Sequence, residues 1–114
     1  QGIFDLGALR RFMQYASRFD LAVFAGIILI SSARMARYMN NNVPGIQVPE
    51  AILTRFSEVE KGKGLQKGIE IAAEFIQTIR EENICQGVHI MAVGNEKLVP
   101  EILEQAGIYR KIGL

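Results

Sequence analysis

The chain has 114 residues, of which 49% are hydrophobic, and this suffices for one compact unit with a real core. Its 13 Lys and Arg against 12 Asp and Glu leave a net charge of +1. The sequence therefore lacks the excess of positive charge that indicates binding to nucleic acid or to an anionic membrane. The single cysteine, Cys85, cannot form an internal disulfide, which favours a reducing compartment. We therefore expect a cytoplasmic protein with no nucleic-acid or membrane partner.

The start of the chain and its most apolar run carry no targeting signal. Leu21–Ile30 has ten residues, too few to cross roughly 30 Å of hydrocarbon as a helix, so it is expected inside the protein. The first residues show neither an initiator Met nor the basic and apolar regions of a signal peptide. We expect a start within a longer polypeptide.

The first predicted elements are a helix and a strand. Asp5 is a good N-cap, and the apolar residues after it recur at steps of three and four, which predicts a helix over residues 6–18. Leu21–Ile30 is apolar on both alternating faces, as a parallel strand covered on both sides must be. A helix of the same length is the alternative, and Gly26 argues against it.

Two shorter helices are predicted next. Ser31 and Ser32 can cap the first, and the run Asn40–Asn42 ends it, because Asn tolerates the left-handed conformation. Residues 43–49 are irregular, and the proline at their end suits the first position of a second helix over residues 49–60.

The longest predicted helix follows a flexible connection over residues 61–64. Apolar residues repeat from Leu65 to Ile79 with charged residues on the other face, a pattern typical of an outer-layer helix. Gly87–Val93 predicts a second buried strand, and a last helix with Pro100 in its first turn stops at Gly107.

Strands separated by helices in this way predict an α/β fold with parallel strands. Only two full strands are predicted, and a two-stranded parallel sheet has too little area to offset the entropy cost of ordering the chain. Neighbouring strands must therefore come from elsewhere.

Three segments resemble the methylenetetrahydrofolate reductase family in order and spacing. They are QGIFD at Gln1–Asp5, AGIILISSARMARYMNNNVPGIQVPE at Ala25–Glu50 and GVHIMAVGNEKLVPEILEQAG at Gly87–Gly107. The middle segment is the most specific, and the resemblance covers nearly the whole chain. It implies that residues 1–114 form the C-terminal portion of a (β/α)8 TIM barrel, an incomplete barrel of parallel strands with outer helices.

Barrel enzymes carry their chemistry at the carboxyl ends of the strands. By resemblance, the residues expected to bind substrate at three such ends are Gln1, Ile28, Ser31, Ala33, Val93 and Asn95. Gln1 matches a Gln whose amide pairs with the pterin ring, although a capping or exposed role is the alternative. Ala33 occupies a position where some relatives carry an aromatic residue that stacks on the folate, and Asn95 stands where a basic residue can occur.

The resemblance implies an oxidoreductase of one-carbon metabolism that passes hydride from NAD(P)H to FAD and from the reduced flavin to 5,10-methylenetetrahydrofolate, giving 5-methyltetrahydrofolate. The family's general acid, the Asp near its flavin and most flavin contacts find no match here, so no catalytic residue is assigned. We expect a segment that supplies part of the folate-binding wall, depends on the N-terminal barrel portion as its partner, belongs to a homo-oligomer and is inactive alone.

Two alternatives stay open. One is a non-catalytic half-barrel module that satisfies its strand edges by self-association. The other is a different barrel reductase or a transferase domain that shares only the topology.

Three further signals are given structural interpretations. His89, the only histidine, is expected to be a hydrogen-bonded core residue, and no metal site is expected. The glycine-rich stretch 62–68 lacks the spacing of a phosphate loop and is interpreted as a hinge. Arg34, Arg37 and Arg55 are expected on solvated helix faces, and the alternative is that Arg34 or Arg37 approaches the anionic tail of a folate.

Overall fold

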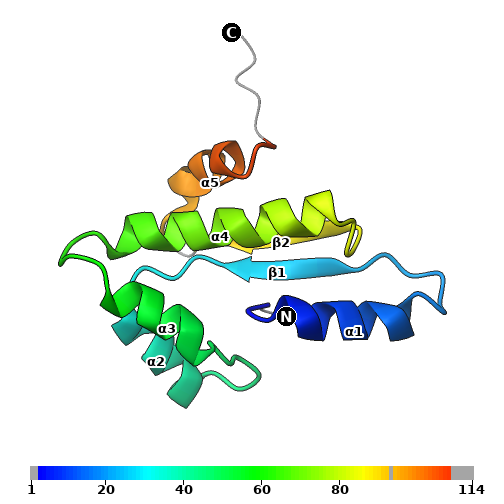
Figure 1. The fold of residues 1–114 in the computed structure, drawn as a ribbon, viewed down its shortest axis with the longest axis horizontal. Helices are drawn as coiled ribbons and strands as arrows, with labels where there is room; N and C mark the ends of the chain where they lie inside the picture. Colours follow the sequence, from blue (N-terminus) through cyan, green and yellow to red (C-terminus); the bar gives the residue numbers. More distant parts are fainter. Residues whose placement is uncertain (1–2, 93, 109–114) are drawn as a thin grey trace, which may run out of the picture.

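The computed structural model describes residues 3–92 and 94–108, which form an α/β fold (Figure 1). The elements in chain order are α1 (Leu6–Ala16), β1 (Phe24–Ile28), α2 (Ala33–Asn42), α3 (Glu50–Ser57), α4 (Gly64–Glu81), β2 (Gly87–Met91), the 3₁₀ helix η1 (Glu96–Leu98) and α5 (Val99–Gln105). The predicted order of helices and strands is therefore confirmed. The strands are shorter than predicted, with five residues each.

The two strands run parallel, with Ile28 of β1 beside Met91 of β2. On the other edge of β1, the amide of Ile3 donates a hydrogen bond to the carbonyl of Gly26 at 2.8 Å. β1 therefore has β2 on one edge and the segment before α1 on the other, so it occupies an internal position in the backbone hydrogen-bond ladder.

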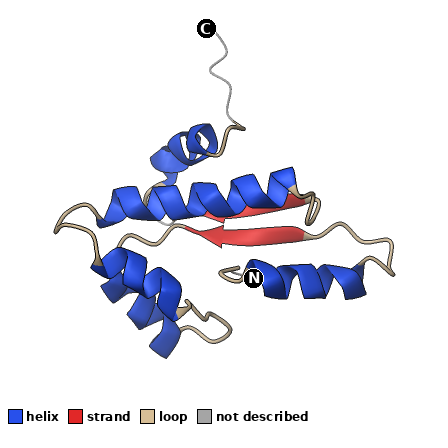
Figure 2. Cartoon of the chain, in the orientation of Figure 1, coloured by secondary structure: helices blue, strands red, loops and turns tan. Residues whose placement is uncertain are grey.

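Helix α4 runs along one face of the sheet (Figure 2). The side chains on this face are buried. Ala25 and Ile27 project from β1 on this face, and Val88 and Ile90 lie beside them on β2. The rest of this first core comes mainly from α4 and α5: Leu9, Leu29, Ile69, Ala72, Ala73, Ile76, Ile79, Ile84, Ala92, Ile102 and Ala106. Full burial of one such aliphatic side chain contributes about 1.5–3 kcal/mol, so this core is the main source of stability.

The opposite face of the sheet is largely open within the described residues. Phe24 is 61% exposed, and His89, which lies beside Gly26 on this face, is exposed. The expectation that both strands are covered on both sides is therefore wrong for this part of the chain. His89 is not a core residue, because residues alternate between the two faces of a strand and His89 falls on the face away from α4.

A second core joins α2, α3 and the first half of α4. Its buried residues are Phe4, Ile30, Ala36, Val48, Ile52, Leu53, Phe56 and Ile71. On the surface of this region, Arg55 forms two parallel hydrogen bonds to the carboxylate of Glu74, at 2.7 and 2.6 Å, and so links α3 to α4. Within residues 3–92 and 94–108, no helix has the length and hydropathy needed to span a membrane.

Candidate functional site

The carboxyl ends of β1 and β2 meet at one edge of the sheet, which we call the carboxyl edge. The amide of Leu29 donates a hydrogen bond to the carbonyl of Met91 at 2.9 Å. The two strands therefore stay paired as far as the turns that lead into α2 and η1. The turn after β1 spans residues 29–32, and the turn after β2 includes Gly94 and Asn95. Since the strands are parallel, side chains from both turns lie at the same end of the sheet.

The turn after β1 places three of the predicted site residues close together in the chain. Ile28 is half-buried on the face away from α4 and packs against the second core. Ser31 is half-buried, and its hydroxyl lies 3.5 Å from the sulfur of Met35. Ala33 is the first residue of α2, which Ser32 caps by accepting a hydrogen bond from the Met35 amide at 3.0 Å.

The turn after β2 holds Asn95 through its backbone. The Asn95 amide donates to the carbonyl of Ala92 at 2.7 Å, and its own carbonyl accepts from the amide of Leu98 at 2.9 Å. Its side chain is half-buried and forms no hydrogen bond to any other described residue. The Asn95 amide group is therefore available, as both donor and acceptor, to a ligand at this edge.

The structure thus brings Ile28, Ser31, Ala33 and Asn95 to one end of the sheet. The other two predicted site residues, Gln1 and Val93, lie outside the described residues. The six-residue site stays a prediction as a whole.

Two glycines that the sequence analysis interpreted as part of a hinge have a packing role. A Cβ atom added to Gly64 would lie 2.1 Å from the carbonyl oxygen of Ser31, and one added to Gly68 would lie 1.7 Å from that of Ile30. Both glycines belong to α4, so the hinge interpretation is wrong for them. They allow the first turns of α4 to contact the backbone of the carboxyl edge directly. Their spacing of four residues on one helix face is the signal that could have revealed this role.

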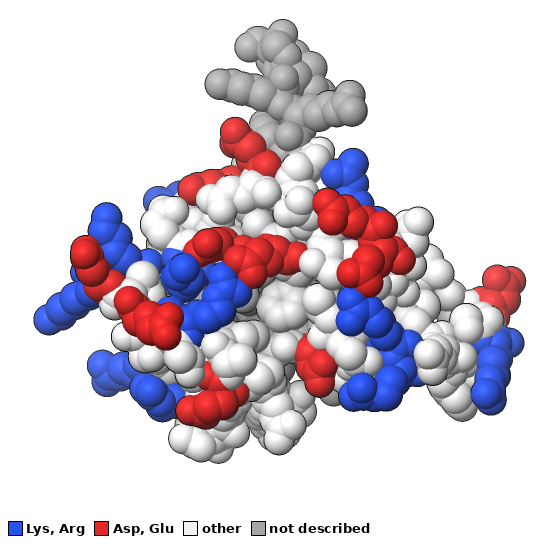
Figure 3. Space-filling model, in the orientation of Figure 1, with Lys and Arg blue, Asp and Glu red and all other residues white. Residues whose placement is uncertain are grey.

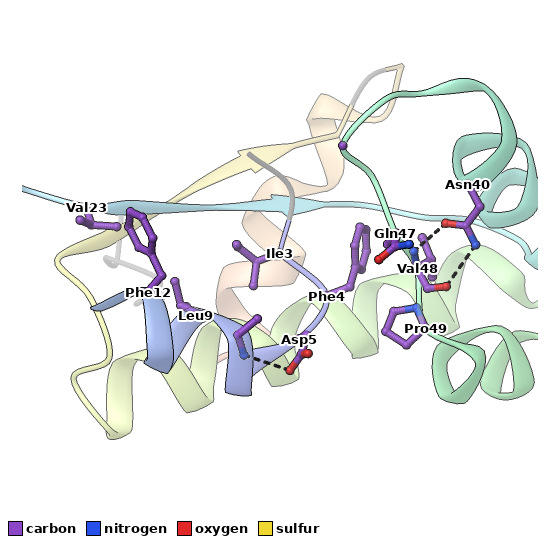
Figure 4. Close-up of a pocket in the computed structure, with 12 residues that line it drawn as sticks. Ile3, Phe4, Asp5, Leu9, Phe12, Val23, Asn40, Gln47, Val48 and Pro49 are labelled. Atoms are coloured by element: carbon purple, nitrogen blue, oxygen red, sulfur yellow. Dashed lines mark hydrogen bonds between the residues drawn. The ribbon is translucent and has the colours of Figure 1, made fainter. Parts of the chain in front are cut away.

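Asn40 holds the loop between α2 and α3 and was not predicted to do so. Its side-chain amide donates to the carbonyl of Val48 at 3.1 Å, and its side-chain oxygen accepts from the Val48 amide at 2.6 Å (Figure 4). The Asn40–Asn42 run ends α2 without a left-handed residue, because positive φ among the described non-glycine residues occurs at Asn83. Asn40 acts through hydrogen bonding, as a substitute for a backbone partner.

A groove of about 770 Å³ runs between α1 and this loop (Figure 4). Ile3, Phe4 and Phe12 line one part of it, and Gln47 and Pro49 line another. The Asp5 carboxylate lies at its rim, where it caps α1 by accepting from the Ala8 amide at 3.2 Å. The groove follows the edge of β1 opposite β2, since Ile3 and Val23 both line it.

Two charged groups with shifted pKa values lie on the outer helices α3 and α4. A hydrogen bond to Glu74 raises the pKa of Arg55, and a hydrogen bond from Lys67 lowers the pKa of Glu70. Acidic and basic side chains are interspersed on the face drawn in Figure 3. Across the described ranges, no group of three or more His, Cys, Asp or Glu side chains is placed to hold a metal ion.

Parallel strands with helices packed along one face define an α/β protein. The chain belongs to the methylenetetrahydrofolate reductase family, whose sequence model matches residues 1–107. This match covers nearly the whole chain and confirms the resemblance seen in the sequence; the family is one of oxidoreductases. No curated protein matches the chain.

Proposed function

We propose that this chain is the C-terminal part of a (β/α)8 barrel that reduces 5,10-methylenetetrahydrofolate to 5-methyltetrahydrofolate with electrons from NAD(P)H by way of FAD. In this proposal the carboxyl edge supplies one wall of the folate site. The chain needs the N-terminal barrel strands for activity, because they carry the catalytic acid and most of the flavin contacts.

The observation that carries this proposal is the convergence of two strand ends in a member of this family. Ile28 and Ala33 come from one turn, and Asn95 comes from the other. Ile28 and Ala33 offer an apolar surface to a ring system, and the free amide of Asn95 offers a donor and an acceptor to a polar ring edge. These residues bind and orient the folate, and none of them transfers a proton.

The edges and faces of the sheet support the proposal that the chain belongs to a barrel. The Ile3 amide continues the ladder beyond β1, and the exposed face with Phe24 and His89 corresponds to the interior that further strands would cover. A barrel closes both the edge and the face, since every strand then has two neighbours.

The described residues do not by themselves fit a flavin dinucleotide. Its pyrophosphate requires a cradle of backbone amides, and the glycine-rich stretch 62–68 offers none, because Gly64 and Gly68 are in contact with the backbone of Ile30 and Ser31. We therefore assign FAD binding mainly to residues outside this chain.

The test uses the complete polypeptide that contains this segment. We expect the purified protein to show the absorption bands of an oxidised flavin and to reduce methylenetetrahydrofolate with NADH or NADPH. Asn95→Ala should raise the KM for the folate severalfold and leave the flavin content unchanged, because about 1–3 kcal/mol is lost when a buried hydrogen-bond partner is removed. Gln105→Ala, which removes an exposed amide from α5, should leave the KM unchanged. A flavin-free protein that reduces no folate would refute the proposal.

The alternative function is a non-catalytic module that covers its open face by self-association. The exposed apolar side chains Phe12, Tyr15, Phe19, Leu21 and Phe24 are the observation that favours it. It predicts a dimer of the 114-residue chain in size-exclusion chromatography, without flavin or folate binding.

A further inference from the structure

An exposed apolar patch lies where α1 ends and the chain turns into β1, and we call it the α1–β1 patch. It consists of Tyr15, Phe19 and Leu21, which are 57%, 51% and 64% exposed. The ring centroids of Tyr15 and Phe19 lie 5.5 Å apart, and the Leu21 amide donates a hydrogen bond to the Phe19 carbonyl at 2.9 Å. Single exposed apolar side chains are ordinary, but three large ones close together indicate a contact site.

The α1–β1 patch and the candidate folate wall lie at opposite ends of β1. The strand begins at Phe24, shortly after the patch, and ends at Ile28 beside the carboxyl edge (Figure 1). At about 3.3 Å per residue, these two ends are roughly 13 Å apart along the strand. A partner bound at the patch therefore leaves the carboxyl edge open to substrate.

Two charged residues of opposite sign flank Phe19 in the sequence. Arg18 and Asp20 are both exposed, and the Arg18 guanidinium lies 6.0 Å from the centroid of the Tyr15 ring, beside the patch. Neither residue belongs to the ion pairs of the described part of the chain, which join Arg10 to Glu82, Arg55 to Glu74 and Lys67 to Glu70. The patch thus carries one positive and one negative charge that the fold itself does not pair.

We propose that two copies of this chain associate through the α1–β1 patch, with Arg18 of each copy paired with Asp20 of the other. The argument is charge complementarity. In a two-fold contact the same surface is used by both copies, so a patch must complement itself. When the axis passes near Phe19, the residue before it meets the residue after it in the other copy. The opposite charges then face each other twice across the axis.

The size of the patch fits a dimer of moderate affinity. An aromatic side chain has roughly 200 Å² of surface, so three side chains that are about half exposed offer on the order of 300 Å² per copy. A stable complex buries about 800 Å² per partner. The patch can therefore form the apolar centre of such an interface, with Arg18 and Asp20 in its polar rim. We expect a dimer that dissociates on dilution.

The test measures the dissociation constant of the dimer for the complete polypeptide, by sedimentation velocity over a range of concentrations. Arg18→Asp and Asp20→Arg each place like charges opposite each other, so each should raise the Kd about tenfold or more. The double variant Arg18→Asp/Asp20→Arg restores opposite charges across the axis and should return the Kd to within about threefold of its original value. Both residues are exposed, so the fold should be unaffected.

A matched pair of variants tests the apolar part of the interface. Leu21→Ser should raise the Kd about tenfold to hundredfold, because each copy loses an apolar contact. Tyr38→Ser removes a side chain of similar exposure, 63%, from α2 and should leave the Kd unchanged.

A complete polypeptide that stays monomeric at about 100 μM would overturn the inference. Equal effects of Leu21→Ser and Tyr38→Ser, or a double variant that does not recover its affinity, would do the same. A dimer formed through the face that carries Phe24 and His89 would not respond to the charge reversals, so an unchanged Kd in both single variants also rejects the α1–β1 patch as the interface.

Discussion

On the face of the sheet that packs against α4, Ala25 and Ile27 are each 2% exposed, whereas Phe24 of the same strand is 61% exposed on the other face. The first face is complete, because helices of this chain supply its apolar partners. The second face offers an aromatic ring and an imidazole, and both side chains are exposed among the described residues. A strand whose one face is covered by helices, which we call the finished face, and whose other face is exposed, which we call the open face, is suited to a larger sheet.

We expect the largest loss in the free energy of unfolding from a substitution that disturbs the packing of α4 on the finished face of the sheet. Gly68→Ala places a Cβ atom 1.7 Å from the Ile30 carbonyl oxygen, which is backbone and cannot move aside without shifting β1 or α4. We expect a loss of about 3 kcal/mol or more in the free energy of unfolding, measured by chemical denaturation. Gly7→Ala in α1, whose added Cβ meets only side-chain atoms at 3.2 and 3.4 Å, should change it by less than about 1 kcal/mol. Equal effects of the two variants would contradict this account of α4 packing.

A smaller effect is expected at the open face, and it depends on whether that face is covered in the complete polypeptide. There, Phe24→Ala should cost about 3 kcal/mol by denaturation, the lower end of the range for a buried aromatic residue. Phe24 also covers Gly87, because a Cβ atom on Gly87 would lie 2.7 Å from its ring. Ile27→Ala serves as the reference, with an expected loss of about 2–5 kcal/mol on the finished face. A cost below about 1 kcal/mol for Phe24→Ala would mean that the second face stays open and that the barrel is wrong.

We expect the smallest loss in the free energy of unfolding from a substitution on the exposed side of α4, which faces away from the sheet. The hydrogen bond from Lys67 lowers the pKa of Glu70, so the folded state favours the ionised carboxylate. A lowered folded pKa stabilises the fold above the unfolded pKa of about 4.3, and the contribution is lost as pH falls through the folded value. Glu70→Gln should therefore cost only a few tenths of a kcal/mol at pH 7, since the pair is exposed. Unfolding curves at pH 7 and near pH 3 should show this difference vanish at the lower pH, and a difference that persists would rule out the pair as its cause.

Much of the fold was predictable from local patterns. Asp5 accepts the Ala8 amide as an N-cap should, and the apolar repeat from Leu65 to Ile79 is the buried side of α4. The prediction for His89 was wrong, because an apolar neighbourhood in sequence does not say which face of a strand a helix will cover. At the site, the sequence named the two turns that meet at the carboxyl edge but missed Asn40 and the two glycines of α4.

The sequence by itself determined the order of helices and strands, their parallel α/β character and the family, because each depends on spacing between near neighbours or on long matching segments. Only the tertiary structure decided which face of the sheet is finished and how α4 meets the carboxyl edge. Gly68 contacts Ile30, and the Ile3 amide bonds to Gly26. These partners are tens of residues apart, so no local pattern encodes them, and they form only when the chain packs.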